Sequence, residues 1–92
     1  MIEPNGKQNV GEAVIIGLQA LAWTLGDGQR ATRMLAVTGL EAGDLRARAS
    51  EPALLAALLG FLEAHEPDLI ACAADLEIRP AALVAAREAL ES

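Results

Sequence analysis

The chain has 92 residues, enough for one hydrophobic core and too few for two stable domains. Its formal net charge of −6 argues against non-specific attraction to nucleic acids or to anionic lipid surfaces. Apolar residues make up 53% of the chain but aromatic residues only 2%, so leucine, alanine, isoleucine and valine must fill the core. Because alanine and leucine are among the strongest helix formers, this composition predicts an all-α protein.

Neither export nor membrane insertion is expected. The sequence does not open on a basic region followed by an apolar run, as a secretory signal would require. The longest apolar stretch, Ala13 to Leu25, includes Gln19 and Thr24 and is shorter than the about 20 residues that cross a bilayer. The single cysteine, Cys72, excludes an internal disulfide framework and fits a reducing compartment. We therefore expect a cytoplasmic protein.

The first predicted helix spans residues 10–25 and follows a flexible polar tail at residues 1–8. Asn9 is its expected N-cap, because Glu12 three positions later completes a capping box. The residues expected to face the core recur every three or four positions: Val10, Val14, Leu18, Leu21 and Leu25. The remaining positions are largely apolar as well, so this helix should be either central in the core or shared with a second subunit.

Two shorter helices are expected next. Asp27 caps the first of them, at about residues 29–38, and its Arg30 should point to solvent. Gly39 stands where a left-handed residue commonly ends a helix. A helix of about two turns is then expected at residues 42–49.

The most apolar helix is predicted at residues 52–65. Ser50 is its expected N-cap, and Pro52 lies in the first turn, where a missing N–H costs no hydrogen bond. Its core-facing residues form a wide helical stripe: Leu54, Leu55, Leu58, Leu59, Phe61 and Leu62. Gly60 costs about 1 kcal/mol of helix propensity relative to alanine, which predicts that another helix backbone approaches closely there; the alternative is a tolerated surface glycine.

Two prolines divide the remaining sequence into two more helices. Pro67 begins one at about residues 67–76, and Pro80 begins the last at about residues 80–90. The first of these should face the core through Leu69, Ile70, Ala73 and Leu76. The complete prediction is a compact all-α bundle of five to six short helices in a single domain, residues 9–92, with the first helix and the leucine-rich helix at its centre.

No pattern in the sequence indicates an active site or a cofactor site. His65, Glu66 and Asp68 lie at a helix junction, with Cys72 further along, and such groups can bind metals. Charges at those positions also suit the ends of two successive helices, and this is the favoured interpretation. Cys72 lies in an apolar segment, where a thiol is unreactive. We predict no catalytic residue, no metal site and no cofactor.

Arginines concentrate in the middle of an otherwise acidic chain. Four of them, with the single tryptophan, form the candidate interaction surface: Arg30, Arg33, Arg46, Arg48 and Trp23. A helix, a turn containing glycine and a short helix carrying Arg46 and Arg48 have the order of parts of a helix-turn-helix. That short helix offers no Asn or Gln for base edges, and the net charge is negative, so nucleic-acid binding is only the alternative hypothesis. The favoured expectation is that the arginines pair with acids of the second half of the chain and cover apolar surface with their stems.

Several motifs resemble a known family. They are Thr38-Gly-Leu-Glu-Ala-Gly-Asp-Leu-Arg-Ala-Arg-Ala49, Glu51-Pro52 and Leu58-Leu-Gly-Phe-Leu62, with Leu21-Ala-Trp23 and Asp27 upstream. Through them residues 10–90 resemble a family of small all-helical proteobacterial proteins classed as a domain of unknown function. The resemblance implies a small helical protein of the bacterial cytoplasm. It carries over no catalytic or binding residue, because the family has none assigned.

The excess of apolar helix surface leads to a hypothesis of function. One small core cannot absorb every side of both the first helix and the leucine-rich helix. We therefore predict a non-enzymatic protein–protein interaction module that offers an apolar helical face to a protein partner or, as a homodimer, to a second copy of itself. The alternative is a helix-turn-helix-like accessory of a nucleic-acid process that uses Arg46 and Arg48.

Overall fold

The computed structural model describes residues 10–92, and within that range all regular structure is helical. The helices are α1 (Val10–Leu25), α2 (Gly28–Thr38), α3 (Ala42–Arg48), α4 (Pro52–Ala64), α5 (Glu66–Leu76) and α6 (Pro80–Glu91). The predicted all-α bundle is thus confirmed for the described residues, while the tail and the Asn9 cap lie outside them. No helix between residues 10 and 92 combines the length and the hydropathy of a membrane span.

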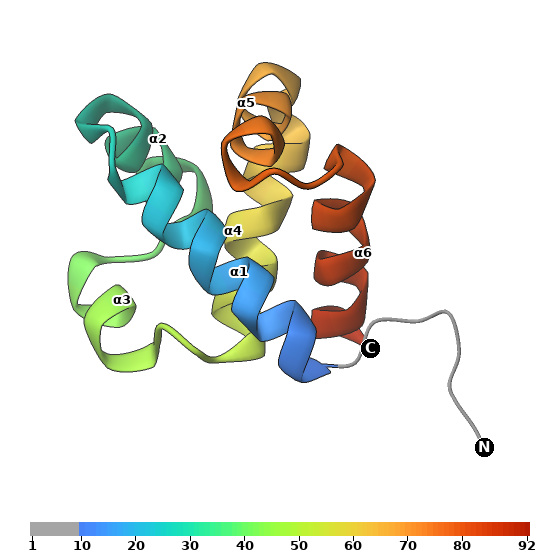
Figure 1. Cartoon of the computed structure of the whole chain (residues 1–92). Helices are drawn as coiled ribbons and strands as arrows, with labels where there is room; N and C mark the ends of the chain where they lie inside the picture. Colours follow the sequence, from blue (N-terminus) through green and yellow to red (C-terminus); the bar gives the residue numbers. More distant parts are fainter. Residues whose placement is uncertain (1–9) are drawn as a thin grey trace.

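The centre of the bundle is made by α1, α4 and α6 (Figure 1). The predicted leucine stripe of α4 is confirmed, and its buried residues are Leu54, Leu55, Ala56, Leu58, Leu59, Phe61 and Leu62. From α6, Leu83, Ala86 and Leu90 enter the same core. At the surface, Arg87 of α6 forms an ion pair with Glu63 of α4, which joins the two helices outside the apolar contact.

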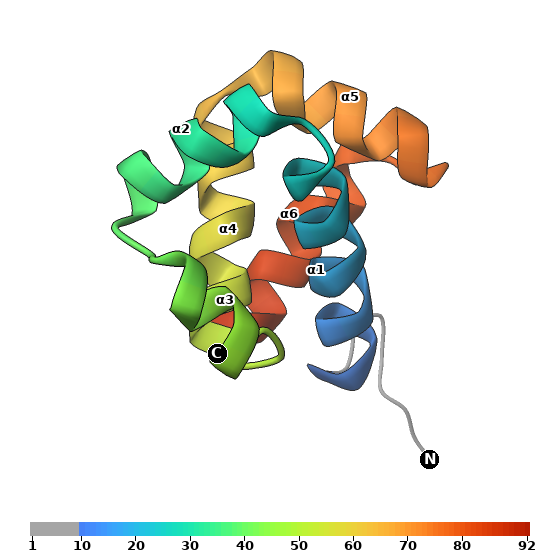
Figure 2. The same ribbon diagram turned by 90° about the vertical axis from the view of Figure 1, so that its left-hand side faces the viewer.

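One end of this three-helix centre is covered by α2 and α5, which lie at the top of Figure 2. Met34 of α2 and Cys72 and Ala73 of α5 are buried there. The prediction that Ile70 faces the core is wrong, because Ile70 is 51% exposed and Cys72 holds the inward position instead. Apolar residues follow one another without interruption around these positions, so hydrophobicity did not distinguish the inner side of α5 from its outer side.

The short helix α3 buries none of its residues completely. Leu45, together with Leu40 before the helix and Ala49 after it, is partly buried against the core. Its first turn is closed by the Asp44 side chain, whose Oδ2 accepts a hydrogen bond of 2.9 Å from the backbone N–H of Glu41. The segment is therefore attached to the bundle by a few half-buried side chains.

The helix ends follow the predicted local chemistry in most places. The Asp27 side chain accepts a 3.0 Å hydrogen bond from the backbone N–H of Arg30 and so caps α2. Gly39 ends α2 in the left-handed conformation with φ 77°. The prediction of Ser50 as the cap of α4 is wrong, because Glu51 holds the N-cap position without a side-chain cap bond. Proline at the next position favours an extended residue before it, and Glu51 adopts that conformation.

The face that α1 turns to the core also differs from the prediction. The buried residues are Ala13, Gly17, Ala20, Leu21 and Thr24. Within the predicted stripe, Leu21 is buried, Val14 and Leu18 are partly buried, and Val10 and Leu25 are 51% and 43% exposed. A helix that is apolar on all sides does not reveal its inner face through hydrophobicity. Small residues lie inward here, because they let α1 lie close to its neighbours.

Close helix approach occurs at Gly17 of α1. A Cβ atom at this position would lie 3.1 Å from the Cβ of Leu55 and 3.2 Å from its Cδ1. A Cβ at Gly60 would have Cδ of Arg87, at 3.9 Å, as its nearest neighbour outside its own helix. The prediction of a close backbone approach at Gly60 is therefore wrong, and that role belongs to Gly17.

Candidate interaction surface

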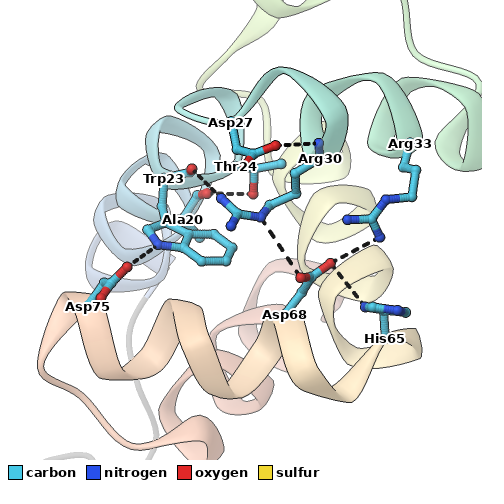
Figure 3. Close-up of polar contacts among 9 residues, drawn as sticks. All are labelled: Ala20, Trp23, Thr24, Asp27, Arg30, Arg33, His65, Asp68 and Asp75. Carbon is cyan, nitrogen blue, oxygen red and sulfur yellow. Dashed lines mark hydrogen bonds and ion pairs between the residues drawn. The ribbon is translucent and has the colours of Figure 1, made fainter.

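Three of the five predicted surface residues meet where α1, α2 and α5 come together (Figure 3). Trp23 lies near the end of α1, and Arg30 and Arg33 lie on α2. Asp68, near the start of α5, faces both arginines. We call this group, with the neighbouring His65 and Asp75, the Asp68 cluster.

Arg30 does not point to solvent as predicted. Its Cζ lies 3.6 Å from the centroid of the Trp23 ring, and its Nη1 donates a 3.2 Å hydrogen bond to the Trp23 carbonyl oxygen. Stacking on the indole leaves only 20% of the Arg30 side chain exposed. The indole Nε1 donates in turn to Oδ2 of Asp75 at 2.6 Å, which fixes the ring against α5. Trp23 and Arg30 thus form a contact inside the fold rather than a free patch.

The Asp68 carboxylate lies close to Arg30, Arg33 and His65. Oδ2 of Asp68 lies 3.3 Å from Nη1 of Arg33 and 3.0 Å from Nδ1 of His65. Its Oδ1 lies 3.9 Å from Nε of Arg30, beyond hydrogen-bonding distance. That Nε is buried and has no hydrogen-bond partner within the described residues. The Asp68 side chain is 13% exposed, and its ion pairs link α2 to α5. These pairs agree with the prediction that Arg30 and Arg33 pair with acids of the second half of the chain.

Arg46 and Arg48 lie elsewhere, on α3. Nε of Arg48 lies 2.9 Å from Oε1 of Glu51, and its Nη1 lies 3.6 Å from Oδ1 of Asp44. Arg46 is exposed and forms no ion pair within residues 10–92. The predicted surface therefore divides into the Asp68 cluster and a separate exposed pair on α3.

An open depression of about 700 Å³ lies beside the Asp68 cluster. It is lined by Gly28, Gln29, Thr32 and Arg33, all from the first half of α2. Ligand sites usually enclose most of a small molecule between several elements. A shallow lining from one helix does not provide that enclosure, so the depression is not a candidate ligand site.

Among the side chains considered for catalysis or metal binding, Cys72 is buried and His65 contacts Asp68. Cys72 is buried, and burial raises the pKa of its thiol to about 11, so the thiol is protonated at neutral pH. The His65 side chain is 50% exposed and is engaged by Asp68. Among the residues that the structure describes, no three His, Cys, Asp or Glu side chains gather in a way that could hold a metal ion.

A second surface was not among the predicted site residues. Opposite its buried face, α1 carries a set of exposed or partly exposed residues that we call the outer face of α1: Gly11, Ile15, Leu18, Gln19, Ala22 and Leu25. The exposed Glu12 lies on the same side of the helix, in its first turn. Ile15 is 59% exposed and Leu25 is 43% exposed. In Figure 1 no other helix lies in front of α1. The sequence does contain a signal for this face, which is the stripe of small residues at Ala13, Gly17 and Ala20. If these small residues face the core, the larger apolar residues of α1 must face away from it.

Comparison with known proteins places the chain in a family. The family described as "Protein of unknown function (DUF3572)" matches residues 11–92. The chain belongs to this family. The resemblance suggested by the motifs is thereby confirmed, and the family's description assigns no activity. Neither the curated proteins nor the solved structures include a match, so function must be argued from the surfaces described above.

Proposed function

We propose that the protein is a non-enzymatic protein–protein interaction module that binds through the outer face of α1. The observation that carries this proposal is the exposure of Ile15 and Leu25 on one face of one helix, at 59% and 43%. Scattered apolar residues are normal on a protein surface, but a continuous apolar face is typical of an interaction site. Ala22 lies exposed between them and leaves room for a side chain of the partner.

The lack of charge on most of this face indicates what kind of partner surface can bind to it. No ionisable side chain occurs from Ala13 to Gly26, so a charged segment would find no counter-charge there. An amphipathic helix whose apolar side lies against Ile15 and Leu25 meets this requirement. The polar groups of the Asp68 cluster are already engaged with one another, which supports a structural role for that cluster.

A charge placed on the outer face tests the proposal. Ile15→Glu should leave the fold intact, because the side chain is exposed, and should weaken binding of protein partners by its desolvation cost. Val37→Glu is the matched control, since Val37 is 68% exposed on a different helix. Tagged proteins are isolated from the native cell and the bound proteins are quantified, with circular dichroism to check folding. A folded Ile15→Glu variant that retains every partner of the wild type would refute the proposal.

The alternative function is nucleic-acid binding through α2 and α3. In its favour, Arg46 and Arg48 are exposed on the same short helix. Against it, α3 has only 7 residues and the arginines of α2 are engaged by Asp68. Titration of duplex DNA at low salt decides the matter: binding that weakens with salt and drops in Arg46→Ala plus Arg48→Ala supports the alternative, and no binding at low salt removes it.

A further inference from the structure

The segment around α3 buries less than any other described helix. Each of the other five helices buries at least one residue completely, whereas α3 buries none. In Figure 1 α3 forms the outermost part of one side of the bundle, and Figure 2, which looks onto that side, shows it in front of the first half of α4. From residues 40–50 only Leu40, Leu45 and Ala49 pack against the core, and each of them remains partly exposed.

The polar contacts of this segment do not join it to another helix. The Asp44 side chain accepts from the backbone N–H of Glu41 at 2.9 Å. Nε of Arg48 lies 2.9 Å from Oε1 of Glu51, and its Nη1 lies 3.6 Å from Oδ1 of Asp44. Within residues 10–92, every ion pair and side-chain hydrogen bond of residues 41–51 is of this local kind. Elsewhere ion pairs join α2 to α5 and α6 to α4.

The segment is not needed to hold its neighbours together. The helices that it connects, α2 and α4, pack directly against each other. Residues 39–51 would span about 40 Å when extended, whereas packed helices lie about 8–10 Å apart. At the start of the segment Gly39 has a positive φ of 77°, and a Cβ atom there would meet no non-neighbouring atom within 4 Å. The segment can therefore leave the bundle without pulling on either helix.

We propose that residues 40–50 form a strap that opens as one unit while the other five helices stay folded, and that conceals an apolar flank of the bundle when closed. Opening exposes the core-facing sides of Leu40, Leu45 and Ala49 together with the surface that they cover. Because α3 has only 7 residues, it is too short to remain helical alone in water, so the open strap is unfolded chain. The inference does not rest on the proposed function, which concerns the outer face of α1.

The buried core does not depend on the strap. Every buried hydrophobic residue of the described chain lies in one of the other five helices. The contacts of the Asp68 cluster, which join α1, α2 and α5, also lie outside the strap. Segments with few buried apolar contacts open at a lower free energy than the core of the same protein. Opening of the strap therefore precedes global unfolding.

Amide hydrogen exchange under native conditions tests the independence of the strap. Relative to their rates in the unfolded chain, the amides of α3 should be protected at least about 100-fold less than those in the middle of α4. Equal protection of α3 and α4 would show that α3 opens only when the whole protein unfolds, and the inference would be overturned.

A matched pair of variants tests what the strap covers. Leu45→Glu places a carboxylate against the core, so its desolvation cost should keep the strap open. Ala47→Glu adds the same charge at an exposed position of the same helix and should behave as the wild type. Leu45→Glu should therefore bind a dye specific for exposed apolar surface severalfold more strongly than Ala47→Glu, and its α3 amides should exchange nearly as fast as in unfolded chain.

The rest of the fold is followed in the same variants. Trp23 is fixed by Asp75 and Arg30, away from the strap, so its fluorescence should be the same in Leu45→Glu and in the wild type. A Leu45→Glu variant that loses the Trp23 signal and all exchange protection would make α3 an integral part of the fold and overturn the inference. So would a Leu45→Glu variant that matches Ala47→Glu in dye binding and exchange, because the strap would then cover no apolar flank.

Discussion

The close packing of α1 on α4 at Gly17 makes a sharp prediction for Gly17→Ala. Two opposite effects follow from the added methyl group. Alanine in the middle of a helix is more favourable than glycine by about 1 kcal/mol. The new Cβ would lie 3.1 Å from Cβ of Leu55, closer than ordinary van der Waals contact. Either α1 must move away from α4 or Leu55 must shift within a packed core.

The magnitudes decide which effect dominates. Overpacking of a well-packed core typically costs about 1–3 kcal/mol, against the about 1 kcal/mol gained from helix propensity. We therefore expect Gly17→Ala to range from neutral to about 2 kcal/mol destabilising. Gly60→Ala is the matched control within α4, because the nearest atom to its Cβ outside the helix is Cδ of Arg87 at 3.9 Å. It should stabilise the protein by about 0.5–1 kcal/mol.

Urea unfolding followed by far-UV circular dichroism measures both variants. Protein concentrations below any self-association keep the unfolding free energies comparable, since dimer formation would add to apparent stability. Gly17→Ala should be less stable than Gly60→Ala by about 1–3 kcal/mol. Equal stabilisation by the two substitutions would show that α1 and α4 have room at Gly17, and the reason given for the inward small-residue face would be wrong.

Three further predictions concern the core, the Asp68 cluster and the thiol. Leu58→Ala should cost about 2–5 kcal/mol in urea unfolding, because Leu58 is fully buried, and a loss below about 1 kcal/mol would contradict that burial. Asp68→Asn should cost about 1–3 kcal/mol of unfolding free energy, because it leaves the largely buried Arg30 without its anion. Glu51→Gln, in an exposed ion pair, is the control and should cost less than about 0.5 kcal/mol. Equal costs would contradict the structural role of the Asp68 cluster. Cys72 should react with iodoacetamide at least about tenfold more slowly in the folded than in the unfolded protein. Because its pKa is raised from 9.0 to about 11, the unfolded thiol ionises first, so stability should fall between these pH values, and less so in Cys72→Ala.

The features that the sequence predicted correctly depend on local chemistry. The leucines and the phenylalanine of α4 fall on one wide stripe, and the remaining positions of the helix are mostly alanine, glycine and proline, so the large side chains indicate the inner face. The Asp27 cap and the left-handed Gly39 follow from hydrogen bonding and backbone conformation within a few residues. Each of these was recognisable without knowing where another helix lies.

The features that the sequence did not predict depend on contacts between distant segments. In α1 the inner and outer sides are both apolar, and the choice between Leu25 outward and Ala20 inward depends on how closely α4 can approach. The charge balance predicted that Arg30 pairs with an acid of the second half. The charge balance could not identify Asp68 as that acid, because the choice depends on the rotation of α5 about its axis. It also could not predict that the Arg30 guanidinium would lie over the Trp23 ring.

The weak attachment of α3 has a consequence for proteolysis. Because no residue of α3 is fully buried, the segment between Gly39 and Glu51 can open while α1, α4 and α6 stay packed. Within residues 10–92, trypsin should therefore cut first after Arg46 or Arg48, which are both exposed. The two fragments would remain bound to each other through the contact of α1 with α4 and α6. The protein would then persist as a nicked complex, and its chain could be divided at α3 into two halves that recombine.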